Sequence, residues 1–139
     1  MKNLLEIDNV KIRFRTKGML KAVIDRDKDP YIEAVCGASL TIKQGETFAL
    51  VGESGAGKTT LARSIIGLVT PSQGSIRYQD QELMGLDDKA FKPLKRDIAM
   101  MFQDPVGCLS PRLSVRSIIT EPFKIHGLPI NDVSKEATK

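Results

Sequence analysis

Apolar residues recur at every second position near the start of the chain, with one shift in the middle, at Leu5, Ile7, Val10, Ile12 and Phe14. A period of two predicts a strand with one buried face. Asp8-Asn9 interrupts the alternation and predicts a turn or bulge between two parts of that strand. The alternation returns over residues 31–42, after a polar stretch at 15–30 that predicts a loop. Two strands of the antiparallel type are therefore expected.

A different pattern covers the middle of the chain. Residues 47–51 form a continuous apolar run, which is typical of a strand covered on both faces. A glycine-rich loop follows at 52–57, and residues 58–68 then place their apolar side chains on one face at helical spacing. The order of strand, loop and helix predicts an α/β fold in which a small β-rich region lies beside a parallel core.

The rest of the chain predicts short elements. They are a strand at 75–78, a weak helix at 87–96 interrupted by Pro93, an apolar strand at 98–102, a structured loop at 104–112, a helix at 114–125 kinked by Pro122, and the start of a helix at 131–139.

The glycine-rich loop carries the clearest chemistry. Its residues fit the pattern G-x-x-x-x-G-K-[ST], with Gly52, Glu53, Ser54, Gly55, Ala56, Gly57, Lys58 and Thr59. Glycines permit backbone conformations in which successive N–H groups point inward around an anion, and the helix that follows adds its positive N-terminal end. In this pattern Lys58 reaches the β- and γ-phosphates and the Thr59 hydroxyl binds Mg²⁺. The loop therefore predicts a binding site for a nucleoside triphosphate.

Composition narrows the classes of function. The chain has 139 residues, of which 41% are hydrophobic and 27% charged, so wholesale disorder is excluded. The net charge of +4 comes from residues 11–28, with seven basic and two acidic side chains. This local excess predicts a solvated loop and no nucleic-acid partner, although contact with anionic lipid or RNA stays an alternative.

The same sequence bears on localisation. No apolar run approaches the roughly 20 residues of a membrane-spanning helix, and the N-terminus lacks the features of a signal peptide. We therefore expect a cytoplasmic protein. Cys36 and Cys108 are far apart in the sequence and are expected to be reduced, packed thiols.

Several motifs together resemble one family. The stretch 52–60, GESGAGKTT, resembles the Walker A motif of the nucleotide-binding subunits of ABC transporters, and the run 98–102 followed by Gln103 resembles their Q-loop. Similarity to the oligopeptide, dipeptide and nickel importer branch lies in AVCGASL at 34–40, FQDP at 102–105, CLSPR at 108–112 and EPFKIHG at 121–127. The resemblance implies an ABC-type P-loop NTPase core with an N-terminal antiparallel β subdomain.

The resemblance also implies a function and its residues. Such a subunit is a membrane-associated ATPase on the cytoplasmic face that drives the uptake of peptides or related solutes. Its partners are membrane-spanning permease subunits and a second ATPase subunit, homologous or identical, and its cofactors are ATP and Mg²⁺. The nucleotide would lie on residues 52–60, including Thr60. Lys58 and Gln103 would be catalytic, and Thr59 and Gln103 would hold Mg²⁺.

Two of these assignments have alternatives. Tyr31 would stack on adenine, with Phe14 as the rival aromatic, but Tyr31 can equally pack at the start of its strand. Gln103 read from spacing alone can be a polar residue that ends a buried strand. His126, the only histidine, does not match the family's catalytic histidine and is expected at a surface or helix end.

The sequence lacks other parts of the family's machinery. No apolar strand ends in a Walker B aspartate, because Asp97 precedes its run and Asp104 follows Gln103. A signature motif and a switch histidine are also missing. Residues 1–139 are therefore predicted to be the N-terminal part of an ABC ATPase domain, with the helical subdomain and Walker B absent. We expect weak ATP binding and negligible ATPase activity from this chain alone.

Three other classes stay open. One is a truncated nucleotide-binding fragment that cannot hydrolyse ATP. Another is a P-loop kinase or GTPase, although an arginine-bearing lid and an Asn-Lys-x-Asp motif are both missing from the sequence. The last is a binding module that has no enzymatic activity and contacts membrane or RNA through its basic segment.

Overall fold

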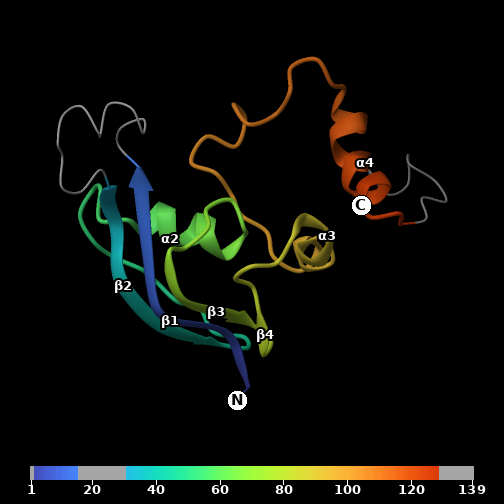
Figure 1. Cartoon of the computed structure of the whole chain (residues 1–139). Coiled ribbons are helices and arrows are strands. Elements are labelled where there is room, and N and C mark those ends of the chain that lie inside the picture. The colour runs from blue at the N-terminus through green and yellow to red at the C-terminus, as the bar shows by residue number, and fades with distance from the viewer. Residues whose placement is uncertain (1, 16–30, 129–139) are drawn as a thin grey trace. The chain divides into compact units, whose positions relative to one another are not determined.

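An antiparallel sheet organises the first part of the computed structural model, which describes residues 2–15 and 31–128 (Figure 1). Within these residues the sheet has four strands in the order β2-β1-β3-β4. Its strands are β1 (Asn3–Arg15), β2 (Tyr31–Lys43), β3 (Gln73–Tyr78) and β4 (Gln81–Glu82). The helices are α2 (Lys58–Ile65), α3 (Asp88–Phe91), the 3-10 helix η1 (Leu94–Arg96) and α4 (Val115–Ile125). The chain divides into two compact units, residues 1–91 and 92–139.

The core of the first unit follows the predicted alternation in β1. The inward side chains of β1 are buried as far as Ile12 and meet those of the neighbouring strands, so this core includes Leu5, Ile7, Val10, Ile12, Val35 and Ile76. The last position of the predicted alternation, Phe14, is 45% exposed, so the buried face ends before it. Ile7 pairs with Leu40 of β2 on one side and with Ile76 of β3 on the other. The predicted interruption at Asp8-Asn9 is confirmed as a bulge, because Asn9 has φ 44° and the β1–β2 register shifts between Ile7 and Val10.

The two continuous apolar runs behave differently from the prediction. Neither 47–51 nor 98–102 forms a strand, and neither is covered: Val51 is 89% exposed and Met101 is 85% exposed. A strand forms only by hydrogen bonding to a neighbour, and none of the four strands among residues 2–15 and 31–128 pairs with either run. The prediction that these two runs form doubly covered strands of a parallel core is therefore wrong for the described residues.

Other predictions are confirmed with shifted bounds. The helix after the loop ends at Ile65, the weak helix at 87–96 divides into α3 and η1 on either side of Pro93, and α4 continues through Pro122. His126 is the C-cap of α4, as expected of a helix end. Cys36 and Cys108 are free but exposed, so the prediction that they are packed is wrong. The predicted loop over 16–30 and helix over 131–139 lie outside the described residues.

The basic segment is partly in the sheet. Arg13 of β1 lies opposite Glu33 of β2 and donates from its Nε to Glu33 Oε1 over 2.7 Å. This hydrogen bond and the charge of the guanidinium hold the pKa of Glu33 below its ordinary value. The prediction of a solvated loop over 11–28 is therefore wrong for residues 11–15, which extend β1.

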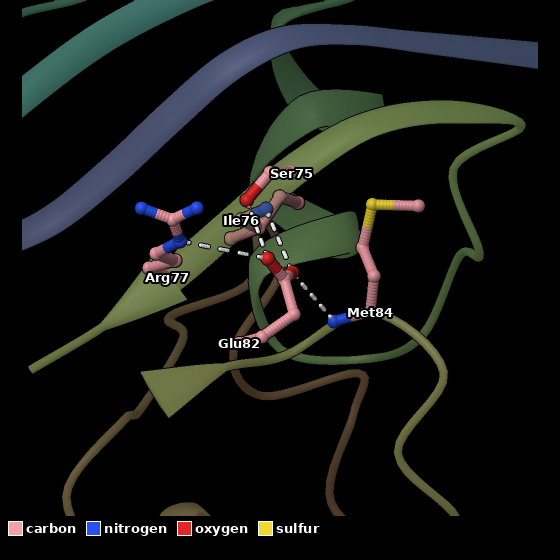
Figure 2. A network of polar contacts seen from close by, with 5 residues as sticks. All are labelled: Ser75, Ile76, Arg77, Glu82 and Met84. Carbon is pink, nitrogen blue, oxygen red and sulfur yellow. Dashed lines mark hydrogen bonds and ion pairs between the residues drawn. The ribbon is translucent and has the colours of Figure 1, made fainter. Parts of the chain in front are cut away.

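Glu82 ties β4 to β3 through a polar network (Figure 2). Its carboxylate accepts hydrogen bonds from the Ser75 hydroxyl, from Ile76 N over 3.1 Å and from Met84 N over 3.0 Å, and Arg77 Nε lies 3.8 Å away. Partial burial of Glu82 raises its pKa, but the bonds from Ser75, Met84 and Ile76 together outweigh this effect, so the pKa lies below its ordinary value of 4.5.

Replacing Glu82 by a neutral side chain is expected to make the stability of the fold less dependent on pH under acidic conditions. A carboxyl whose pKa is lowered by folding contributes stability above its unfolded pKa, and this stability is lost as the pH falls through the folded pKa. Glu82→Gln should therefore lower the melting temperature near neutral pH. Between about pH 6 and about pH 3, the melting temperature of this variant should decrease less steeply than that of the unsubstituted chain. Thermal unfolding followed by circular dichroism at several pH values measures this.

The control for this experiment is Glu46→Gln, at an exposed carboxylate that accepts from Lys43 N over 2.7 Å. It should change the profile less, because it replaces one backbone hydrogen bond and not a network. Equal profiles for the two variants would contradict the role given to Glu82.

Candidate phosphate-binding site

The glycine-rich loop leads directly into α2, as the motif requires. Gly57 is the N-cap of α2 and has φ 83°, a left-handed conformation that L side chains rarely adopt. The first turn of α2 has no acidic side chain, so the positive end of the helix is not neutralised by its own residues. The loop therefore presents backbone N–H groups and a helix N-terminus to the same small region.

A cavity of about 150 Å³ lies at this point. Its lining comes from the loop, from the first turn of α2 and from one residue of β2: Ala34, Gly55, Ala56, Gly57, Lys58, Thr59 and Thr60. Its size suits a phosphate group, and its lining includes two hydroxyls and an ammonium. The cavity thus fits the anion that the motif predicts.

Lys58 bends back over the loop. Its Nζ donates to the carbonyl oxygen of Gly52 over 2.7 Å and to that of Glu53 over 2.6 Å. An ammonium group has three N–H donors, so one remains for an anion in the cavity. The loop also closes on itself through Ala56 N, which donates to Glu53 O over 3.2 Å. The two bonds from Lys58 hold its positive charge over the first residues of the loop.

The predicted site residues are therefore only partly brought together. Residues 55–60 line the cavity, and Gly52 and Glu53 take part through their carbonyl groups. Ser54 lies in the loop turn without lining the cavity. Tyr31 stands at the start of β2, opposite Arg15, and is 46% exposed; the rival Phe14 is 45% exposed. The adenine-stacking role of Tyr31 stays a prediction.

Gln103 belongs to the second unit. It is exposed and precedes a turn in which Asp104 Oδ1 accepts from Gly107 N over 2.9 Å. Within residues 2–15 and 31–128, no cluster of three or more His, Cys, Asp or Glu side chains could hold a metal ion. The assignments of Thr59 and Gln103 as magnesium ligands stay predictions.

Sequence reasoning missed one lining residue. Ala34 of β2 borders the cavity, and a Cβ on Gly57 would lie only 2.2 Å from the Ala34 carbonyl oxygen. An alanine in an alternating strand carries no chemical signal, because its contribution comes from its place beside the loop. Only the spatial contact between β2 and the loop reveals it.

Comparison with known proteins agrees with the geometry. The ABC transporter family model matches residues 35–138. The chain belongs to this family. Membership implies a nucleotide-binding domain, and it confirms the predicted family and its P-loop fold class.

The similar curated proteins include transport ATP-binding proteins of the expected branch. The chain is 42% identical to the putative oligopeptide transport ATP-binding protein YkfD of Bacillus subtilis, over 90% of this chain and 35% of that protein. It is 39% identical to the oligopeptide transport ATP-binding protein OppF of Escherichia coli, over 90% of this chain and 37% of OppF. The nickel import ATP-binding protein NikE of Shigella flexneri is 49% identical over 62% of this chain and 32% of NikE. The chain therefore spans about a third of the length of these relatives.

A solved structure shows the same fold. The ATP-binding cassette MJ0796, a dimer in a post-hydrolysis state bound to ADP and phosphate, superposes with a TM-score of 0.78 at 24% identity, over 97% of this chain and 53% of that chain. At this identity the likeness concerns the fold. In the part of this ABC chain that the structure describes, no helix has both the length and the apolar character needed to cross a membrane.

Proposed function

We propose that this ABC chain binds Mg²⁺–ATP on residues 52–60, as part of an ATPase subunit that drives the uptake of peptides or related solutes. The observation that supports this most directly is the position of Lys58, whose ammonium is held over a left-handed glycine loop at the N-terminus of α2. A triphosphate would replace the loop carbonyls as the partner of that ammonium. The N–H groups of residues 55–60 would hold the same anion.

The proposed roles of the site residues follow from this placement. Lys58 neutralises the charge on the β- and γ-phosphates. Thr59 and Thr60 both line the cavity, and the Thr59 hydroxyl would bind Mg²⁺. Thr59 and Gln103 would hold Mg²⁺, which would supply positive charge against the phosphates. Tyr31 would stack on adenine, and Gln103 would orient water and contact the metal.

Transport is the second part of the proposal. The relatives are named as ATP-binding proteins of oligopeptide transport and nickel import, and the cassette with the same fold is dimeric. We therefore assign this chain membrane-spanning permease subunits and a second ATPase subunit as partners, at the cytoplasmic face of the membrane. Binding of two nucleotides between two such subunits would drive the transport cycle.

Thermal stabilisation by ATP tests the nucleotide site. A ligand at about 100 times its Kd adds about 2.7 kcal/mol to the free energy of unfolding, which corresponds to a rise in melting temperature of several degrees. We expect this rise with ATP and magnesium and a smaller one with ATP and EDTA. Differential scanning fluorimetry measures both.

Two further arms sharpen this test. Thr59→Val keeps the shape of the side chain and removes its hydroxyl, so it should retain stabilisation by ATP and lose the difference between magnesium and EDTA. GTP in place of ATP tests the competing GTPase class. The absence of any shift with millimolar nucleotide, or a larger shift with GTP, would contradict the proposal.

A further inference from the structure

Strand β2 lies against the phosphate loop at Gly57. A Cβ atom placed on Gly57 would lie 2.2 Å from the carbonyl oxygen of Ala34 and 3.2 Å from Cγ2 of Val35. Contacts below 3.0 Å are not tolerated by real Cβ atoms, so the loop approaches β2 this closely only because residue 57 is a glycine. Gly57, the last residue of the loop, therefore packs closely against β2.

Val35 occupies the position between the loop and the core. Its side chain is 8% exposed, and in the sheet it pairs with Ile12 of β1, which is fully buried. Gly57 has no side chain with which to cap α2, and its backbone carbonyl already accepts from Leu61 N over 2.8 Å. The contact of Gly57 with the sheet is therefore one of packing, against Val35 and the Ala34 carbonyl.

We propose that Val35 is a positioning residue for the phosphate site. Its buried side chain joins the rigid sheet to Gly57, and Gly57 sets the direction of the N–H groups and of Lys58, which follows it. The proposal rests on the proposed function of ATP binding and adds the residue that holds the site in shape. Binding by several converging hydrogen bonds is sensitive to shifts of a fraction of an ångström. A gap behind Gly57 should therefore lower the affinity for ATP more than it lowers the stability of the fold.

A matched pair of valines separates these two effects. Val10 of β1 is completely buried in the same sheet, and Val10→Ala removes the same two methyl groups as Val35→Ala. Its partner in β2 is Ala38, about 10 Å along the strand from the contact with Gly57 at about 3.3 Å per residue. Both variants lose core packing, but only one loses the support of the loop.

The experiment is isothermal titration calorimetry of the chain with magnesium and ATP, at a temperature where circular dichroism shows the variants folded. We expect Val35→Ala to raise the Kd for ATP about 10-fold, which corresponds to about 1.4 kcal/mol of binding free energy. Val10→Ala should lower the melting temperature at least as much and leave the Kd within about two-fold of the original value. Val35→Thr, which keeps the shape and adds a buried hydroxyl, should lower stability and preserve the Kd.

Each outcome has a defined meaning. Equal weakening by Val10→Ala and Val35→Ala, or an unchanged Kd in Val35→Ala, would overturn the inference while ATP binding by the unsubstituted chain still stands. An unsubstituted chain that binds no ATP would remove the proposed function itself. If Val35→Ala does not fold, Val35→Leu replaces it in the experiment. Val35→Leu adds bulk beside Gly57 and is also expected to weaken ATP binding. An unchanged Kd in Val35→Leu would overturn the inference as well.

Discussion

Replacement of Lys58 by alanine is expected to weaken ATP binding about 100-fold. In the proposed complex the ammonium contacts the β- and γ-phosphates, and hydrogen bonds between charged partners contribute about 1.5 to 3 kcal/mol each in proteins. A loss of about 3 kcal/mol corresponds to roughly two orders of magnitude in Kd. Lys58 is half-buried, and the present partners of its ammonium are carbonyl groups of its own loop, so the melting temperature without nucleotide should change little. Calorimetric titration and thermal unfolding measure the two quantities.

The matched control is Lys43→Ala. Lys43 is an exposed lysine at the end of β2 in the same unit, so the variant loses the same unit of positive charge away from the cavity. It should retain the original Kd within about two-fold, since single exposed charges act weakly in water. Comparable weakening by the two variants would mean that ATP is attracted by overall charge, and the assigned role of Lys58 would be wrong.

The features that the sequence predicted well are local ones. A phosphate loop is built from consecutive backbone groups, so the spacing from Gly52 to Thr59 already contains its geometry, and the structure shows the cavity at that place. The bulge at Asp8-Asn9 was predictable for the same reason, since a break in the alternation of β1 marks it. The alternating pattern also identified the buried side chains of β1, which are Leu5, Ile7, Val10 and Ile12.

The features that sequence reasoning missed depend on contacts with other segments of the chain. An apolar run such as 47–51 becomes a strand only when another strand hydrogen-bonds to it, and periodicity cannot say whether that strand is present. The contact of Ala34 and Val35 with Gly57 joins segments that are far apart in the sequence. Its participants carry no ionisable group, so no motif marks them. The Ser75–Glu82 network was missed for the same reason, because it needs the turn that brings β4 back to β3.

Gly74 lies where β3 meets the bulge of β1. Its φ is +98°, and a Cβ atom there would lie 2.6 Å from the carbonyl oxygens of Asp8 and Asn9 and from Cα of Val10. All three are backbone atoms of a central strand, so they cannot move aside as the end of a flexible side chain could. The same junction is held by Ser72, whose backbone N donates to Lys11 O over 2.8 Å and whose hydroxyl donates to the same oxygen over 2.9 Å.

Gly74→Ala is therefore expected to be the most destabilising single substitution considered for this sheet. A left-handed conformation costs a residue with a Cβ about 1 to 2 kcal/mol, and the collision with β1 adds about 1 to 3 kcal/mol of overpacking. A total of about 2 to 5 kcal/mol is a large part of the stability of an ordinary domain and should lower the melting temperature by about 10 °C or more. Thermal and urea unfolding measure this loss.

The control isolates the collision from the backbone strain. Gly85 also has a positive φ, +77°, but no atom lies within 4 Å of a Cβ placed on it. Gly85→Ala should therefore cost only the conformational part, about 1 to 2 kcal/mol. If the two variants lose equal stability, the close approach of β3 to the bulge contributes nothing. A large difference between them would instead mean that β1 and β3 are held at the spacing that only a glycine at residue 74 allows.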